Sequence, residues 1–299
     1  MAARGQLTTR AAMASISMAL FLLVAKAWAV LATGSVAMLG SLADTALDLV
    51  ASIITLLGVR WAAMPADDEH RFGHGKAEAL AALVQVVLIS ISALAIAWRA
   101  IDRFGSNQGT TGFESGAAVS VVAMVATFAL LAYQRYVIRR TGSVAIATDN
   151  VHYQSDLFLN LSVIAALALD QLFGWKEADP VFGLIIAAWL LYGAWNAASH
   201  SVDQLMDREW PDEKRDTLLA LIRAYPGAEG VHELRTRTSG GHDFVQFHLS
   251  LDPAQRLDQV HRAMDELEAA IHRDFPGVDI LIHPDPIGLV EPGQEDVTR

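Results

Sequence analysis

Residues 79–98 read ALAALVQVVLISISALAIAW and contain no charged side chain. A helix rises about 1.5 Å per residue, so about 20 residues cross a hydrocarbon layer about 30 Å thick. The stretch therefore predicts a membrane-spanning helix.

Five further stretches have the same character, with few charges over about 20 residues. The first of the six is too long for a cleaved signal, and five more follow it. We expect a transmembrane domain of residues 1–208 with six helices, at about 11–33, 35–59, 79–98, 115–133, 144–169 and 181–202.

Charge is distributed unevenly between this domain and the rest of the chain. The first 208 residues hold 28 charged side chains and the last 91 hold 27, with a net charge of −9 in the latter. The first part suits a bilayer and the second suits water. An acidic tail excludes a nucleic-acid partner, which needs a basic surface. The chain has no cysteine, so any metal must be bound by histidine and carboxylate.

The connections between the predicted spans carry basic residues mainly on one side. Nine Lys and Arg fall on the side of the amino terminus and three on the opposite side. Basic loops stay in the cytoplasm, so both termini are predicted to be cytoplasmic.

Two pairs of polar residues lie inside predicted spans. Asp44 and Asp48 are one helical turn apart, and so are His152 and Asp156. If these two helices face each other, the four side chains can surround one divalent ion, for which Zn²⁺ is the natural occupant. Alternatively, the residues could serve helix packing through hydrogen bonds. Asp149, one turn before His152, is expected to mark the entrance of its helix.

A third cluster lies in the second connection, MPADDEHRFGHGKAE. Asp67, His70 and His74 fall within eight residues, among glycines and a proline that favour a loop. The three side chains could bind a cation. The stretch is also acidic enough to be simply a solvated loop.

The last part of the chain changes its hydrophobic period. The pattern predicts a helix at 212–224, strands at 231–238 and 243–251, a helix at 257–273 and a strand at 278–283. The order αββαβ indicates a small open sheet with two helices on one face, within a domain of residues 209–290. Residues 291–299 are expected to be disordered.

This tail contains six of the ten histidines. His232, His248 and His283 lie on predicted strands, and Asp285 follows closely, so these side chains could converge on one face as a further metal site. Histidines scattered over a soluble surface are the alternative interpretation.

Taken together, Asp44-x3-Asp48, FGHGKAE, HYQSD and LMDREWPDE leading into an αββαβ tail resemble the cation diffusion facilitator family. The resemblance implies a homodimer in the bacterial inner membrane, with a ferredoxin-like, metallochaperone-like cytoplasmic domain. It also implies a transporter that exchanges cytoplasmic Zn²⁺ for protons.

The resemblance assigns residues to three metal sites and one charge interlock. It implies a transport site at Asp44, Asp48, His152 and Asp156, a loop site at Asp67, His70 and His74, and a cytoplasmic binuclear site at His232, His248, His261, His283 and Asp285. The interlock falls on Lys76 and Asp207. Pro284 departs from the family pattern and affects one expected contact of the binuclear site.

Two other functions compete with metal/proton antiport. A membrane metalloenzyme needs an open water position, whereas all four expected ligands here come from the protein, and no HExxH is present. A passive channel is disfavoured because a closed tetrahedral site holds an ion too tightly. We therefore expect a transporter and not an enzyme. Zn²⁺ is preferred, and Cd²⁺, Fe²⁺, Co²⁺ and Mn²⁺ share its ligands.

Overall fold

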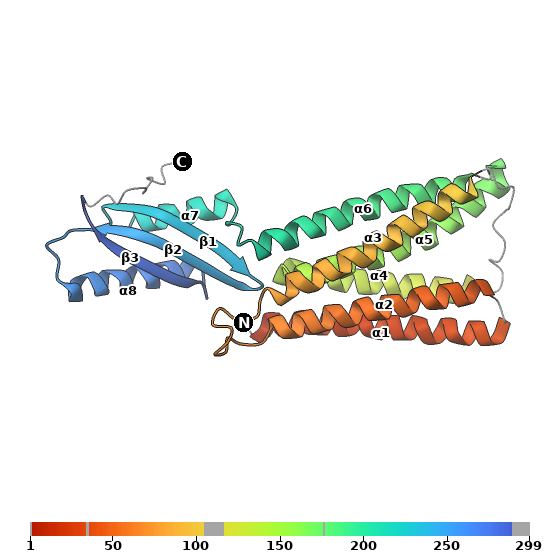
Figure 1. The fold of residues 1–299 in the computed structure, drawn as a ribbon, viewed down its shortest axis with the longest axis horizontal. Helices are drawn as coiled ribbons and strands as arrows, with labels where there is room; N and C mark the ends of the chain where they lie inside the picture. Colours follow the sequence, from red (N-terminus) through yellow and green to blue (C-terminus); the bar gives the residue numbers. More distant parts are fainter. Residues whose placement is uncertain (1, 34–35, 105–116, 176, 289–299) are drawn as a thin grey trace. The chain divides into compact units, whose positions relative to one another are not determined.

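The computed structural model describes residues 2–33, 36–104, 117–175 and 177–288. The chain forms two compact units that divide after Val202. The first unit is a bundle of long helices lying side by side, and the second is a small sheet with two helices (Figure 1).

The helices of the first unit lie where the apolar stretches predict them and continue past the expected span ends. Their bounds are α1 (Ala2–Thr33), α2 (Val36–Ala62), α3 (Ala77–Arg103), α4 (Ala117–Thr141), α5 (Val144–Phe173) and α6 (Ala178–Leu205). Within the described residues, parts of α1, α2, α3, α5 and α6 are long and apolar enough to cross a membrane. The added turns contain polar residues, because a helix continues beyond the hydrocarbon layer wherever its backbone bonds remain satisfied.

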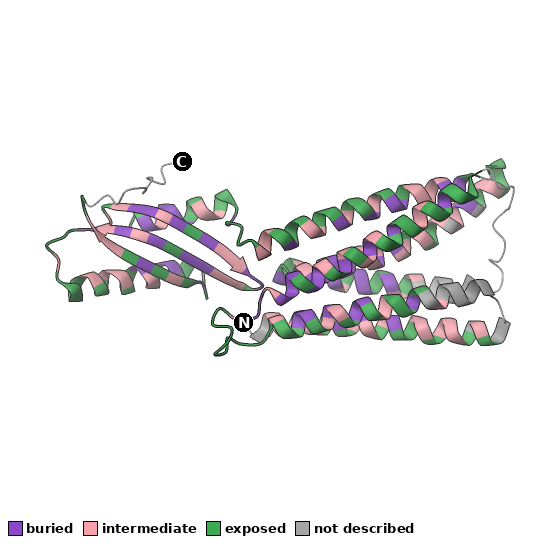
Figure 2. Ribbon diagram, viewed as in Figure 1, coloured by how far each residue is buried: buried purple, intermediate pink, exposed green. Residues whose placement is uncertain are grey.

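The first unit has large apolar side chains on its outside and polar side chains inside. Leu31 is 86% exposed and Trp98 is 74% exposed, whereas Gln85, Gln134 and Asp149 are buried (Figure 2). Such a surface is compatible with lipid and not with water. The predicted fold class, a membrane helical region followed by a small soluble domain, is confirmed.

Helix α5 has defined signals at both ends. The side chain of Ser143 accepts a hydrogen bond from the Ile146 backbone N–H at the start, and Gly174 has a left-handed conformation (φ 69°) at the end. A side-chain cap satisfies a free N–H of the first turn, and a left-handed residue ends a helix at low cost when it is glycine. The 30 residues between them form one helix.

The second unit has the predicted order αββαβ. It contains α7 (Asp212–Arg223), β1 (Gly230–Ser239), β2 (His242–Leu251), α8 (Leu257–Asp274) and β3 (Asp279–Pro286). Strand β2 lies in the middle, antiparallel to β1 and parallel to β3. The parallel pairing is possible because α8 carries the chain back across the sheet.

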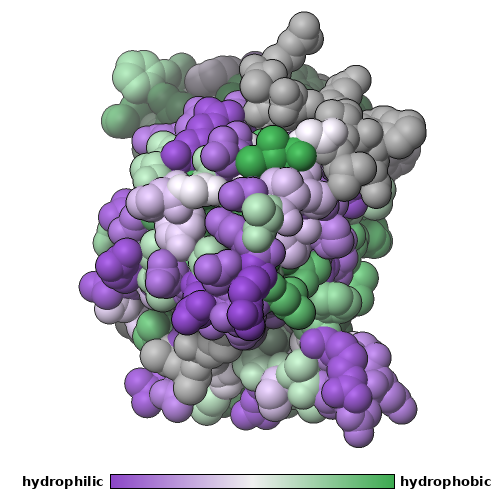
Figure 3. Space-filling model, turned by 90° about the vertical axis from the view of Figure 1, so that its left-hand side faces the viewer, coloured by the Kyte–Doolittle hydropathy of each residue, from purple (hydrophilic) through white to green (hydrophobic). Residues whose placement is uncertain are grey.

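Both helices of the second unit share one apolar core with the sheet. Val245, Phe247 and Leu249 of β2 are buried in it, together with Leu218 of α7 and Leu267 of α8. The alternation of β2 predicts this inward face. Hydrophilic side chains predominate on the face drawn in Figure 3. The predicted disordered segment, 291–299, lies outside the described residues.

Candidate metal centres

Helices α2 and α5 bring three of the four predicted transport-site residues together. His152 Nε2 lies 3.0 Å from Asp48 Oδ1 and 3.9 Å from Asp156 Oδ2. One ligand atom from each residue lies within 4.8 Å of the others. Two carboxylate oxygens and one imidazole nitrogen at this spacing are donors that a divalent cation such as Zn²⁺ accepts.

Asp44 is not part of this group. Its side chain is exposed, although the residue lies one turn before Asp48 on the same helix. Like charges one turn apart repel each other, so the two carboxylates are more stable pointing away from one another. The arrangement therefore contains three of the expected ligands, with the fourth beside them on α2.

A lysine side chain lies beside this site, which the sequence analysis did not indicate. Lys26 Nζ of α1 donates a hydrogen bond of 2.6 Å to the Oγ1 of Thr45, the neighbour of Asp44. The only signal was that a lysine inside an apolar span is rare and costly unless it has a partner.

The predicted role of Asp149 at the entrance of its helix is wrong. It does not mark a helix entrance but is fully buried in the bundle, where Ser15, Gln85 and Gln134 donate hydrogen bonds to it. The spacing along α5 gives the turn on which a residue lies, but the packing of the neighbouring helices decides whether that turn is covered.

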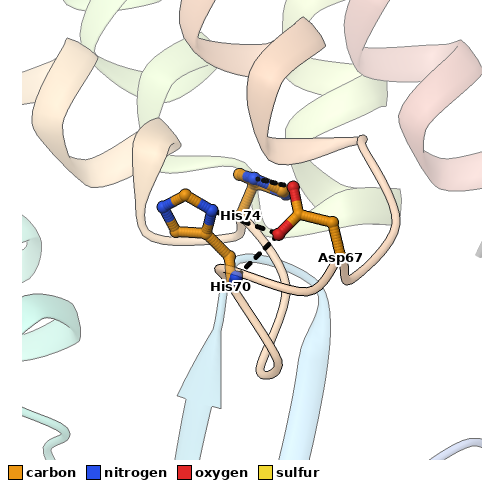
Figure 4. A group of neighbouring side chains, drawn as sticks. All are labelled: Asp67, His70 and His74. Atoms are coloured by element: carbon orange, nitrogen blue, oxygen red, sulfur yellow. Dashed lines mark hydrogen bonds and ion pairs between the residues drawn. The ribbon is translucent and has the colours of Figure 1, made fainter.

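The loop between α2 and α3 brings its three predicted residues together (Figure 4). Asp67 lies 3.3 Å from His70 Nδ1 through Oδ1 and 3.3 Å from His74 Nε2 through Oδ2. His74 is buried, and its Nδ1 has no hydrogen-bond partner in the described part of the chain. The ligand atoms lie within 4.8 Å of one another, so the loop can hold a cation.

Backbone hydrogen bonds fix the carboxylate of this loop. The N–H of His70 donates to Asp67 Oδ1 at 2.6 Å, and the N–H of Glu69 donates to the same oxygen at 3.0 Å. The His70 hydrogen bond is the main reason that the pKa of Asp67 lies below its ordinary value. The carboxyl group is therefore charged, as a metal ligand must be.

In the second unit, strand register forms a row of three histidines. His232 pairs with His248 across β1 and β2, and His248 pairs with His283 across β2 and β3. Asp285, two residues after His283, reaches all three, with its oxygens 3.1 Å from His232, 2.8 Å from His248 and 3.3 Å from His283. His232, His248 and Asp285 form a group whose ligand atoms lie within 4.8 Å.

His261 does not join this row within the protomer. It lies on α8 with an exposed side chain, and Asp265 is its partner at 3.6 Å. Pro284, the departure from the family pattern, lies on β3, which is an edge strand of the sheet. An edge strand tolerates proline because its missing N–H is not needed by a neighbour.

A β-bulge adds one acidic side chain that the sequence analysis missed. The pairing of β1 with β2 shifts between His232 and Arg235, and Glu233 takes a left-handed conformation with φ 49°. Its Oε2 lies 3.8 Å from His248 Nε2 and 3.0 Å from the Arg235 guanidinium. An alternating strand pattern cannot show a bulge, which turns a side chain that would otherwise point away.

The two residues of the expected charge interlock belong to different units. Lys76 lies directly before α3 in the first unit. Asp207 of the second unit has a positive φ of 54°, and its Oδ1 lies 3.3 Å from the Arg237 guanidinium. The interlock stays a prediction.

Two family models cover these units. Residues 12–206 match the cation efflux transmembrane domain, and residues 210–287 match the cytoplasmic domain of cation efflux proteins. The chain belongs to the cation efflux family, also called the cation diffusion facilitators. Members are transporters, so the metalloenzyme alternative is set aside.

Curated relatives match the chain of this cation efflux protein almost end to end. The cation-efflux pump FieF of Shigella flexneri is 43% identical over 286 residues, which cover 96% of this chain and 95% of the relative. FieF of Klebsiella pneumoniae is 43% identical over 291 residues, which cover 97% of each chain.

Proposed function

We propose that this protein exports divalent metal cations from the cytoplasm in exchange for protons, with Zn²⁺ as the preferred cation. The observation that carries the proposal is the group formed by Asp48, His152 and Asp156 on α2 and α5 of the membrane unit. Ionisable residues inside a membrane bundle are costly and mark an ion pathway.

The donor set suits Zn²⁺. Zinc takes four ligands from imidazole nitrogen and carboxylate oxygen, and three are already close together. We assign Asp44 as the fourth ligand, because a change of its side-chain rotamer can turn it towards Asp48 once a cation cancels their repulsion. Cd²⁺, Fe²⁺, Co²⁺ and Mn²⁺ accept the same donors, so selectivity is a matter for measurement.

Proton exchange follows from the chemistry of the ligands. A metal needs neutral imidazole and ionised carboxylates, so protons and metal compete for the same atoms of His152 and Asp156. Opening to the more acidic side favours the protonated, metal-free site. Movement of α2 and α5 against the rest of the bundle would expose the site to each side in turn.

The cytoplasmic domain is proposed to dimerise and to bind metal. The row of His232, His248 and His283 with Asp285 supplies the ligands, and His261 of α8 is proposed to complete a binuclear site in the homodimer. A metal that binds the dimer more tightly than the monomer stabilises the dimer by mass action. We expect Zn²⁺ to tighten the dimer and thereby favour transport.

The proposed location is the bacterial inner membrane with both termini in the cytoplasm. The excess of basic residues in the connections on the amino-terminal side supports this orientation.

Flux of Zn²⁺ and protons in proteoliposomes tests the transport site. We expect Asp48→Ala and His152→Ala to abolish Zn²⁺ uptake driven by a pH gradient. The matched controls are Asp170→Ala on α5 and His200→Ala on α6, which change the same residue types outside the group. Both controls should transport like the wild type. Normal uptake in Asp48→Ala and His152→Ala would remove the assignment.

The same vesicles separate an antiporter from a passive channel. An antiporter acidifies or alkalises the lumen in step with metal movement, and external Zn²⁺ accelerates the exit of labelled Zn²⁺ from the lumen. A channel does neither, so uptake without proton movement and without exchange would contradict antiport.

A further inference from the structure

The carboxyl group of Asp149 lies inside the helical bundle and contacts neutral side chains. It accepts hydrogen bonds from Ser15 Oγ at 2.6 Å and Gln134 Nε2 at 2.7 Å through Oδ2, and from Gln85 Nε2 at 3.3 Å through Oδ1. These donors come from α1, α4 and α3. Asp149 is fully buried, and the three donors are not candidate metal ligands.

Within the described residues, no ion pair reaches Asp149. The charged and titratable groups of the surrounding helices have other neighbours. These are Lys26 of α1 beside Thr45, Asp48 of α2 beside His152, Glu78 of α3 beside Arg4, exposed Arg135 of α4, and Tyr153 and His152 of α5 itself. A carboxylate that is buried without a cation is costly, because the bundle does not replace the water that stabilises its charge. A proton is the counter-charge that this pocket of neutral groups can accept.

Ser15 allows the hydrogen-bond network to hold that proton. Its Oγ lies 2.6 Å from Asp149 Oδ2 and 3.2 Å from the Ala11 carbonyl oxygen, so its own hydrogen has two acceptors. With Asp149 ionised, Ser15 donates to the carboxylate. With Asp149 protonated, the acid donates to Ser15, which then donates to Ala11. In both states Ser15 Oγ and Asp149 Oδ2 keep a hydrogen bond to each other.

Gln85 offers a second hydrogen-bond acceptor for a protonated Asp149. Its Oε1 is buried and accepts no hydrogen bond in the described part of the chain, while its Nε2 faces Asp149 Oδ1. Gln85 Nε2 also donates to Thr55 Oγ1, and a half-turn of the amide gives up that donation while presenting Oε1 as an acceptor to a protonated Oδ1. A carboxyl group surrounded only by fixed donors would lack this freedom.

A hydrogen-bond partner of Ser15 lies next to the transport site. Asp149 and His152 are one turn apart on α5. Tyr153, the neighbour of His152, donates to the backbone oxygen of Ser15 at 2.9 Å and shares a hydrogen bond of 3.1 Å with Ser52 of α2. Ser15 therefore contacts Asp149 through its hydroxyl and, through its backbone oxygen, the residue beside the metal ligand.

We propose that Asp149 is a proton-binding site of this transporter, separate from the metal ligands. Its carboxylate takes a proton from the compartment to which the bundle opens and gives the same proton up to the other compartment after the bundle reopens. The coupling of this step to metal export rests on the proposed antiport function, whereas proton binding by Asp149 does not.

Infrared spectroscopy of the full-length protein in detergent, with a metal chelator present, tests proton binding directly. We expect a carboxylic acid C=O band that appears as the pH falls and is lost in Asp149→Asn. Asp170→Asn is the matched control, because it makes the same change on the same helix, and it should keep the band. Identical spectra of wild type and Asp149→Asn at every pH would overturn the proposal, as would a band from Asp149 that never titrates.

A second variant covers the case in which Asp149→Asn does not fold. Ser15→Ala removes the hydroxyl with two acceptors and keeps the carboxyl group. We expect the Asp149 band to titrate at a different pH in this variant, and an unchanged titration would count against the proposal.

Proton counting in proteoliposomes tests the coupling. We expect Asp149→Asn to move fewer protons per Zn²⁺ than the wild type while binding Zn²⁺ with unchanged affinity, and an unchanged ratio would overturn the coupling. If the wild type moves no protons with Zn²⁺, antiport itself fails, and the infrared titration still decides whether Asp149 binds a proton.

Discussion

Ser143 and Glu78 are joined by a hydrogen bond of 2.8 Å, in which Ser143 Oγ donates to Glu78 Oε1. The other oxygen of Glu78 lies 3.4 Å from the Arg4 guanidinium, whose Nε donates to the Thr141 carbonyl oxygen at 2.8 Å. Glu78 is 1% exposed. One buried carboxylate therefore connects the first turns of α1 and α3 with the cap of α5.

We expect Glu78→Ala to destabilise the membrane unit. The change leaves Arg4 and Ser143 without this acceptor, and an unsatisfied buried polar group costs about 1–3 kcal/mol. Thermal unfolding of the protein in detergent should show a lower Tm. Asp102→Ala removes an exposed acid from the same helix and should leave the Tm unchanged. Equal Tm values for the two variants would show that the connection contributes nothing.

Glu233→Gly should separate stability from metal binding in the cytoplasmic domain. A left-handed conformation costs a non-glycine residue about 1–2 kcal/mol, which glycine avoids at some cost in chain entropy. The metal-free variant should be as stable as the wild type or more stable. It should bind Zn²⁺ more weakly, because the carboxylate 3.8 Å from His248 is gone.

Isothermal titration and unfolding of the full-length protein measure both effects of Glu233→Gly. Glu233→Asp is the control, since it keeps a carboxylate and a side chain at the left-handed position. A Glu233→Gly variant that binds Zn²⁺ like the wild type would show that Glu233 has no part in the metal site.

His248→Ala should weaken Zn²⁺ binding by the cytoplasmic domain more than His272→Ala. His248 is the central member of the row, and its Nδ1 lies 2.8 Å from Asp285. Removing a direct ligand should lower the Zn²⁺ affinity by more than the roughly 10–100-fold that is typical when an outer-shell partner is removed. His272 lies on α8, outside the group. Competition with a chelating dye measures both affinities, and equal losses would refute the assignment.

Tyr225 should give the cytoplasmic domain a pH-dependent stability at alkaline pH. Partial burial, together with its hydrogen bond to Glu266 at 2.9 Å, raises the pKa of Tyr225 above its ordinary value. Because the folded protein holds the phenolic proton more tightly than the unfolded chain, the full stability is present below the pKa of tyrosine in the unfolded chain. The free energy of unfolding then falls as the pH rises towards the higher pKa of Tyr225 in the folded protein.

Tyrosinate absorbance checks the alkaline titration. The wild type should show one phenol that ionises at higher pH than in Glu266→Gln, and Tyr225→Phe should lack that phenol. A titration that is the same in wild type and Glu266→Gln would contradict the role of the carboxylate.

The fold was largely predictable from sequence because lipid and water impose different compositions. Charge-free stretches such as 79–98 indicate spans, and the alternation of Val245 and Phe247 indicates a strand with one buried face. These signals depend on residues near one another in the chain. They gave the αββαβ order and the membrane class, both of which are confirmed.

The candidate sites were predictable only in part. Spacing of one turn placed His152 and Asp156 on one helical face, and the structure brings Asp48 to them. The burial of Asp149 depends on Ser15, Gln85 and Gln134 from other helices, which no local pattern reveals. The position of the Glu233 side chain depends on a bulge, and the contact of Lys26 with Thr45 depends on how α1 packs against α2.

Helix α5 runs without a proline from its serine cap to its left-handed glycine. Asp149 and Asp156 therefore lie on one continuous helix. A tilt of this helix that moves His152 and Asp156 must also move the backbone of Asp149. In the proposed antiport, the helix itself would couple the movement of the metal ligands to that of the proton-binding Asp149.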